Sequence, residues 1–364
     1  MKLADICDIN PKNDPVADET LVSFIAMPNV SENGVIDVST FRPYGEVKQG
    51  FTCFKDGDVL FAKITPCMEN GKGALAVGLK NGIGCGSTEF HVLRPKENAV
   101  VGKWLYYLTA WSVFRVYAER HMTGSAGQKR VPKSFLEKYE LTLPSIKVQE
   151  QQSAQLDHIK RAIQLRTEQL STLDDLIKAR FVELFGDPIT NTKGLETRSL
   201  KDVLVLKAGD FTSASDISEE PSEVNKYPCY GGNGIRGYVA EYNQEGNYSL
   251  IGRQGALSGN VQYATGKFKN TEHALLVTLA IEMNSIWLNQ LLINLDLERY
   301  QTGAAQPGLS VKNLQEIQII NVPIDEQDKF AYFVKQVDKS KVAVQKALDE
   351  AQVLFNSLMQ QYFG

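Results

Sequence analysis

Two stretches of this 364-residue chain place charged, amide and hydroxyl side chains directly after a β-like apolar run. The first is DVLFAKITPCMENGKGA at 58–74, which supplies Lys63, Thr65, Glu69, Asn70 and Lys72. The second is YSLIGRQGALSGN at 248–260, which supplies Arg253, Gln254 and Ser258. Arg and Lys can donate to guanine O6 and N7, and Gln and Asn can pair with adenine N6 and N7. Each stretch therefore has the chemistry to contact base edges, although each taken alone also fits a solvated loop.

Small, glycine-rich segments occur at two further places, TGSAGQ at 123–128 and TGAAQ at 302–306. Such a segment favours a loop, or a backbone cradle for a phosphate. The first runs into GQKRVPK at 127–133, the densest basic stretch of the chain, and the second ends in Gln306. We expect the basic stretch to contact phosphates through its polar residues Gln128, Lys129, Arg130 and Lys133.

GGNGIRG at 231–237 contains the spacing G-x-G-x-x-G. A dinucleotide site would need a strand before this motif and a long apolar helix after it. The flanks NKYPCY and YVAEYNQEG are short, polar and rich in tyrosine. They favour a glycine-rich β-loop between Tyr230 and Tyr238, in which Tyr230, Asn233 and Arg236 are candidate contact residues.

Motifs of common catalytic sites are missing from the chain. The sequence contains no GxxxxGK[ST], no HExxH and no NPPY-like tetrapeptide, and GEVK at 45–48 lacks the preceding PD pair of a nuclease. The four histidines show no HxxxH or HxH spacing. We therefore expect neither a catalytic residue nor a metal site.

Composition is typical of a globular protein, with 43% hydrophobic and 23% charged residues, and the length allows two or three domains. The formal net charge is −4, whereas a protein that binds nucleic acid alone is more often basic. Any nucleic-acid hypothesis must therefore assign part of the positive charge to partners.

The N-terminus, the apolar runs and the cysteines of the sequence predict a cytoplasmic protein. The N-terminus MKLADICDIN is not a signal peptide, and the longest purely apolar run, ALLV at 274–277, is too short to cross a bilayer. We expect reduced thiols rather than a disulfide framework at the five scattered cysteines, Cys7, Cys53, Cys67, Cys85 and Cys229.

The chain repeats itself at an offset of about 180 residues. Besides the two glycine-rich segments, the matching pairs are LADI 3–6 with LKDV 200–203, STEFHVL 87–93 with NTEHALL 270–276, WLYYL 104–108 with WLNQL 287–291, Pro144 with Pro323, Glu150-Gln151 with Glu326-Gln327, and FG 185–186 with FG 363–364. Because the pairs keep the same order, we interpret them as a domain duplication rather than as chance matches.

Each copy ends in a long amphipathic segment, 149–185 and 326–362, with apolar residues spaced by threes and fours. One such helix cannot bury its stripe alone, so we expect two helices of about 50 Å that pair antiparallel with pseudo-twofold symmetry. They would act as a spacer between the domains and as a docking site for partners. Their marker residues are Leu156, Ile163, Leu170, Leu173, Ile177, Val337, Val344, Leu348, Phe355 and Leu358.

In order and duplication, these motifs resemble the specificity subunits of type I restriction-modification enzymes. The resemblance covers the whole chain and rests on the TEF and TEH segments, the TGSAGQ and TGAAQ loops, the LPSIKVQEQ and VPIDEQ entries into the helices, YGGNGIRGY and the two FG ends. It implies an α+β fold with two mixed α/β target recognition domains, 1–145 and 187–322, separated by spacer helices 146–186 and 323–364.

The resemblance also implies a function. Each domain would read one half of a bipartite double-stranded DNA site, and the helix pair would set the unread gap. Two methyltransferase subunits would dock on the helices, and two restriction subunits would join them. S-adenosylmethionine, ATP and Mg²⁺ would belong to those partners, and the chain itself would be non-catalytic and bind no cofactor.

Three alternatives stay open from the sequence. The chain resembles equally the specificity subunit of a related restriction-methylation system that is not of type I. It could instead be a scaffold that uses its duplicated domains to bring partner helices together without binding DNA. A dinucleotide-dependent enzyme rests on GGNGIRG alone.

Overall fold

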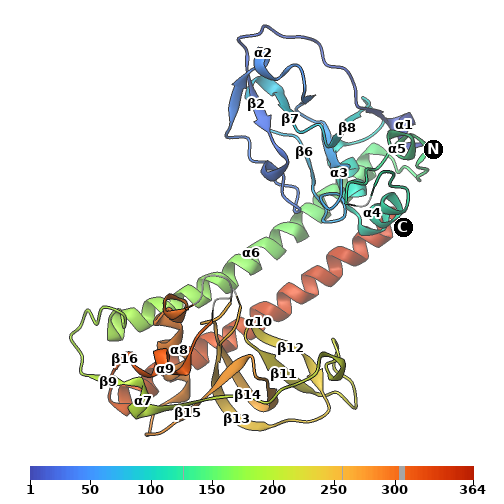
Figure 1. Ribbon diagram of the computed structural model, residues 1–364. Coiled ribbons are helices and arrows are strands. Elements are labelled where there is room, and N and C mark those ends of the chain that lie inside the picture. Colours follow the sequence, from blue (N-terminus) through green and yellow to red (C-terminus); the bar gives the residue numbers. More distant parts are fainter. Residues whose placement is uncertain (126, 256, 303–307) are drawn as a thin grey trace. The chain divides into compact units, whose positions relative to one another are not determined.

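The computed structural model describes residues 1–125, 127–255, 257–302 and 308–364. The chain divides into two compact units (Figure 1). Unit 1 consists of Met1–Leu165 with Ala347–Gly364, and unit 2 consists of Arg166–Lys346. The division cuts both long helices, because α6 spans Ile146–Phe185 and α10 spans Ile324–Phe363.

Unit 1 contains two four-stranded sheets. The first has the order β1 (Cys7–Ile9), β8 (Phe90–Pro95), β5 (Val59–Ala62) and β6 (Gly73–Leu75). The second has the order β3 (Phe41–Pro43), β2 (Leu21–Ile25), β7 (Ile83–Gly86) and β4 (Thr52–Lys55). The shorter helices are α1 (Leu3–Ile6), α2 (Tyr44–Val47), α3 (Gly102–Ala110), α4 (Ser112–Arg120) and α5 (Lys133–Lys138).

Unit 2 is built on one six-stranded sheet and a two-stranded ribbon. The sheet has the order β10 (Leu204–Ala208), β15 (Ala274–Leu279), β13 (Gln244–Gly252), β14 (Val261–Asn270), β11 (Tyr227–Gly231) and β12 (Gly234–Val239). The ribbon pairs β16 (Gln318–Ile320) with β9 (Thr197–Ser199). The shorter helices are α7 (Leu200–Val203), α8 (Ser285–Asn294) and α9 (Val311–Gln315).

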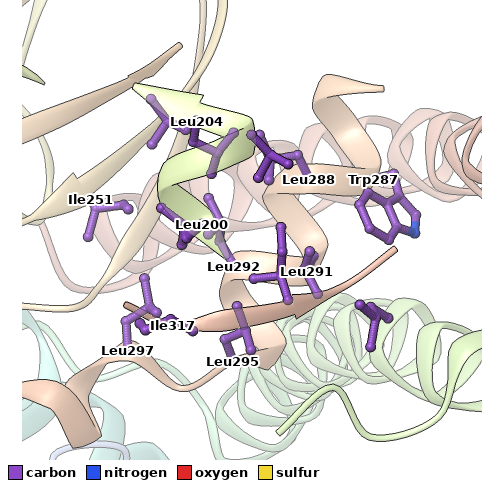
Figure 2. Close-up of a cluster of buried hydrophobic side chains, with 14 of the residues drawn as sticks. Leu200, Leu204, Ile251, Trp287, Leu288, Leu291, Leu292, Leu295, Leu297 and Ile317 are labelled. Atoms are coloured by element: carbon purple, nitrogen blue, oxygen red, sulfur yellow. The ribbon is translucent and has the colours of Figure 1, made fainter. Parts of the chain in front are cut away.

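A tryptophan on an equivalent helix anchors the core of each unit. Trp104 of α3 packs on Phe363 of α10 with 5.0 Å between ring centroids, and Trp287 of α8 packs on Phe185 of α6 at 6.0 Å. Figure 2 shows the core of unit 2, where leucines of α8 lie among Leu200 and residues of neighbouring strands. The predicted duplication is therefore present in the packing of both units.

A buried glutamine joins each long helix to the start of the tryptophan helix. The Gln149 Oε1 accepts from the Val101 amide at 2.8 Å, and the Gln327 Oε1 accepts from the Asn284 amide at 2.8 Å. Gln327 thus corresponds to Gln149, so the predicted match of Gln327 with Gln151 is out of register by two residues. The sequence comparison matched identical residue pairs, whereas in the structure the equivalent residues are the two glutamines whose buried side-chain amides accept these hydrogen bonds.

The long helices pair antiparallel inside each unit, as the heptad pattern predicts. In unit 1, the Tyr362 hydroxyl donates to Gln155, and Leu156 shares a buried cluster with Met359. In unit 2, Phe185 packs on Phe330 with 5.6 Å between ring centroids. Asp174, eleven residues before Phe185, pairs at 2.6 Å with Lys341, which lies eleven residues after Phe330. Numbering that rises along one helix therefore falls along the other.

Two local expectations are corrected by the structure. Cys53 and Cys85 lie opposite each other on β4 and β7, with 4.0 Å between their Cα atoms, and form a disulfide. The expectation that all thiols are reduced is therefore wrong for this pair, because their closeness arises from strand pairing that spacing does not reveal. The repeat also predicts a last strand after the glycine-rich loop of each domain. In unit 1 this strand is reduced to a single bridge between Lys2 and Glu140, whereas unit 2 forms β16 there.

None of the helices in the described part of the chain is long and apolar enough to span a membrane.

Two aromatic residues of α10 give a matched test of the helix pairing. Phe330 is fully buried against Phe181 and Phe185 of α6, whereas Tyr332, two residues later, is 66% exposed. We expect Phe330→Ala to lower the free energy of unfolding by about 3–5 kcal/mol, since it leaves a cavity in a packed core. Tyr332→Ala should change it by about 0.5 kcal/mol or less. Urea unfolding of both variants checks this, and equal effects would contradict the described pairing.

Candidate nucleic-acid interface

The central strands β5 and β13 end one residue before a cation in both units. The Lys63 amide donates to the Glu89 carbonyl at 2.9 Å, and the Arg253 amide donates to the His273 carbonyl at 3.1 Å. On the other side, the Lys63 carbonyl accepts from Val131 at 2.9 Å. The predicted polar loops therefore begin at the same point of both sheets.

Backbone hydrogen bonds join the residues that flank each glycine-rich segment. Thr123 and Arg130, which close the hairpin of unit 1, exchange bonds of 2.9 and 2.8 Å, and Thr302 and Gly308 exchange bonds of 2.9 and 3.0 Å. Single bridges join Arg130 to Ile64 in unit 1 and Gly308 to Gln254 in unit 2. Gln306, the contact predicted for the second segment, lies outside the described residues.

Arg130 closes the hairpin of unit 1 onto strand β8. Its Nε and Nη2 donate to the two carboxylate oxygens of Glu89 at 2.9 and 2.8 Å, and its Nη1 donates to the Gln128 carbonyl at 3.1 Å. The hydrogen bond from Arg130 holds the pKa of Glu89 below its ordinary value. The guanidinium fork is thus occupied within the protein rather than free for a phosphate.

His91 lies under the same hairpin and was not identified from the sequence. Its Nε2 lies 2.8 Å from the Val131 carbonyl, and its Nδ1 lies 3.0 Å from Nδ2 of Asn10. Because the partners are an acceptor and a donor, the geometry fits a neutral ring that donates from Nε2. Burial lowers the pKa of His91, which favours the same form. The repeated STEFHVL segment was the available signal for both Glu89 and His91.

The remaining candidates of unit 1 have different surroundings. The Thr65 hydroxyl donates to the Lys129 carbonyl at 3.0 Å, which ties the strand-end loop to the hairpin. Lys72 instead donates to the Met27 carbonyl at 3.3 Å, and Lys133 pairs with Glu137 on α5 at 3.3 Å. Gln128, Lys129 and Asn70 are exposed, and Glu69 is half-buried.

In unit 2, the GGNGIRG segment turns between β11 and β12, as expected for a β-loop rather than a dinucleotide site. The turn and the strand-end loop line one shallow hollow, whose residues include Asn233, Arg236, Gln254 and His273. The Oε1 of Gln254 lies 2.9 Å from His273 Nδ1, and His273 Nε2 lies 3.1 Å from Glu272. The structure therefore brings two of the predicted segments of unit 2 together.

Two predicted contacts of unit 2 lie beneath the surface. Ser258 is fully buried, so its hydroxyl does not face solvent. Tyr230 is half-buried, and its ring packs on Phe268 with 5.5 Å between centroids. Both residues support the loops rather than line their surface.

The predicted marker residues of the long helices face inward. Leu156, Ile177, Val337 and Val344 are buried, and the others of the set, Ile163, Leu170, Leu173, Leu348, Phe355 and Leu358, are half-buried. Six of them, Leu156, Leu173, Ile177, Val337, Phe355 and Leu358, belong to the hydrophobic clusters of the two units. A different set of apolar residues on the same helices is exposed: Leu165, Leu176, Val182, Tyr332, Val342, Val353 and Leu354.

No group of three or more metal-ligating side chains that could hold an ion occurs among the residues that the structure describes.

The fold places this chain with proteins built from two α/β bodies and two shared helices. A crystal structure of the S subunit of a type I restriction-modification system from M. genitalium has a TM-score of 0.64 at 19% identity, covering 100% of this chain and 95% of that one. A second structure, from work on complex assembly of the type I restriction-modification system, has a TM-score of 0.59 at 17% identity and covers 99% and 96%.

The family follows from sequence comparison. This chain belongs to the type I restriction modification DNA specificity domain family, which matches residues 1–174 and 192–351. It is 39% identical over 198 residues to the specificity subunit of the type I restriction enzyme EcoAI of Escherichia coli, covering 53% of this chain and 33% of that protein. The matched regions span about a quarter to a third of the length of the curated relatives.

Acid should destabilise the hairpin of unit 1 through His91. Since burial lowers its folded pKa, protons bind more readily to the unfolded chain, and stability falls as the pH drops below about 6.5. We expect His91→Gln to reduce the loss of unfolding free energy between about pH 7.5 and about pH 5.5. Urea unfolding at both pH values measures the change in unfolding free energy, and His158→Gln on the exposed surface of α6 is the control. An unchanged pH dependence in His91→Gln would contradict the assignment.

Proposed function

We propose that this chain is the DNA sequence-recognition subunit of a type I restriction-modification system, and that each body reads one half of a bipartite site. One observation carries the proposal: the DNA specificity family matches the chain twice, once along each half. The reading domains are 1–145 and 187–322, and the spacer helices are 146–186 and 323–364.

The arrangement of the loops supports reading by direct contact. In both units a strand-end loop is bridged to a residue that flanks the glycine-rich segment, Arg130 or Gly308. Exposed amides and cations lie on these loops and on the nearby turn, among them Lys129, Gln254 and Arg236. Contacts to phosphate position a protein on the duplex, while contacts to base edges carry the sequence information. Strands that hold amide and cationic side chains close together can supply both the phosphate contacts and the base contacts.

Partner subunits complete the activity in this proposal. Two methyltransferase subunits and two restriction subunits assemble with the chain in the cytoplasm, and they hold S-adenosylmethionine, ATP and Mg²⁺. This chain performs no chemical step and binds no cofactor. The net charge of −4 fits the arrangement, because a complex can supply from its other subunits the cations that neutralise DNA phosphates.

Selection from random duplex DNA tests the proposal. The full chain, assembled with the methyltransferase subunit encoded beside it, should enrich a motif of two short halves with a fixed unread gap, and binding should weaken steeply as salt rises. An assembled complex that enriches no motif would contradict the proposal and favour a scaffold without DNA binding.

Exchange of one reading domain should change one half of the motif. If residues 1–145 are replaced by the corresponding domain of a relative with a different site, we expect a new first half and an unchanged second half. The same selection experiment measures both halves. Simultaneous change of both halves would show that the domains do not read independently.

Lengthening both long helices by one turn should lengthen the gap. One turn adds about 5.4 Å of helix, which corresponds to between one and two base pairs at about 3.4 Å each. Turns inserted after Leu165 and after Lys346 leave both reading domains intact. Selection should then return the original halves with a longer gap, whereas altered halves at an unchanged gap would contradict the spacer role.

A further inference from the structure

We propose that Lys63 and Arg253 are equivalent DNA contacts, one in each unit, and that Arg130 is not a contact but a brace for its hairpin. This inference rests on the proposed function and names the cation that each half-site meets. The ligand is a hydrogen-bond acceptor on DNA, either the O6 and N7 of guanine or a phosphate oxygen.

The backbone of the two residues is held in the same way. Each amide donates to the carbonyl of the residue just before the neighbouring strand, and each carbonyl accepts from the chain after the glycine-rich segment, from Val131 at 2.9 Å in unit 1 and from Leu309 at 3.0 Å in unit 2. The residue after each cation forms a single bridge, Ile64 with Arg130 and Gln254 with Gly308. Three matched contacts fix the correspondence without reference to the side chains.

Strand alternation places both cations on the same face of their sheets. Side chains two residues apart along a strand lie on the same face of the sheet. Lys63 therefore lies on the face of Phe61, and Arg253 lies on the face of Ile251. Phe61 and Ile251 belong to the two tryptophan cores. Each cation therefore begins where the core face of its central strand ends.

Neither cation is neutralised inside the protein. Among the described residues, no carboxylate forms an ion pair with Lys63 or Arg253, and no hydrogen bond of either side chain occurs. Glu89, the acid near Lys63, is already engaged by the fork of Arg130. Half-buried cations that form no hydrogen bond or ion pair within the described part of the protein are available to an anionic or electron-rich ligand.

The surrounding residues differ while the charge is the same. The local sequences are AKIT at 62–65 and GRQG at 252–255. At the position that pairs with the threonine of each segment the units differ, since Gly308 has no side chain where unit 1 has Arg130. A contact common to both units is therefore supplied by the strand end, not by the hairpin cation, whose three hydrogen bonds to Glu89 and Gln128 already use its fork.

Side-chain substitutions in the complex of the full chain with its methyltransferase test the pair. The DNA probes are the selected duplex and a set in which each base pair of either half is changed in turn. We expect Lys63→Ala and Arg253→Ala each to weaken binding about 10- to 100-fold. Controls are Lys138→Ala on α5 and Lys201→Ala on α7, both exposed, which should bind as the wild type does.

The probe set separates the two ligands. If the cation meets guanine, its removal should abolish discrimination at one position of one half only. Arg253→Lys should then weaken binding less than Arg253→Ala does, because lysine keeps the charge but not the planar guanidinium fork. If it meets phosphate, all probes should weaken equally and the salt dependence should decrease by about one ion.

Arg130→Ala gives the second measurement. As a brace it should leave the positions read by Lys63 unchanged, although binding weakens, and Glu89→Gln should have a similar effect. If the wild-type complex discriminates among the probes, but Lys63→Ala and Arg253→Ala bind DNA no more weakly than the control variants, this inference is overturned and the proposed function is not. A wild-type complex that does not discriminate among the probes would instead overturn the proposed function.

Discussion

A forty-residue helix with one apolar stripe is stable in water only when another surface covers that stripe, and the whole chain is arranged to satisfy this constraint. In each unit, half of α6 pairs with half of α10, and the pair is closed by a tryptophan helix from the α/β body. Trp104 meets the end of α10, and Trp287 meets the end of α6. Unit 1 therefore completes its core only with the C-terminal residues 347–364, whereas unit 2 forms its core within the continuous segment 166–346.

The same rigid cores fix the ends of the central strands. β5 and β13 are hydrogen-bonded on both sides, so the residues that follow them emerge at a defined point. Each unit then secures its loops with different side chains. Unit 1 uses Glu89 with Arg130, and unit 2 uses His273 with Gln254. A common backbone frame with different polar residues is what two readers of different half-sites require.

Patterns that depend on local sequence were predictable. The heptad spacing predicted helices at 149–185 and 326–362, and the structure begins them two or three residues earlier and ends them at Phe185 and Phe363. The duplication, the antiparallel pairing and the strand ends at Lys63 and Arg253 also follow from periodicity and repeats. These features need only a few residues of context along the chain.

Features that depend on distant pairing were not predictable. The sequence does not reveal that unit 1 has two small sheets where unit 2 has one of six strands. The Cys53–Cys85 disulfide arises from neighbouring strands 32 residues apart. Residue type suggested Ser258 and Arg130 as contacts, but the fold buries the hydroxyl and ties the guanidinium to Glu89. Burial and partners decide a side chain's role, and both are tertiary properties.

The most direct test of the account is a long-read methylation map of cells that express this chain with its neighbouring methyltransferase, compared with cells that lack the chain. The account predicts a new methylated motif with two specific halves and a fixed unread gap, present only when the chain is expressed. An unchanged methylation pattern, in cells where the complex is shown to assemble, would contradict the claim that this chain selects the DNA sequence.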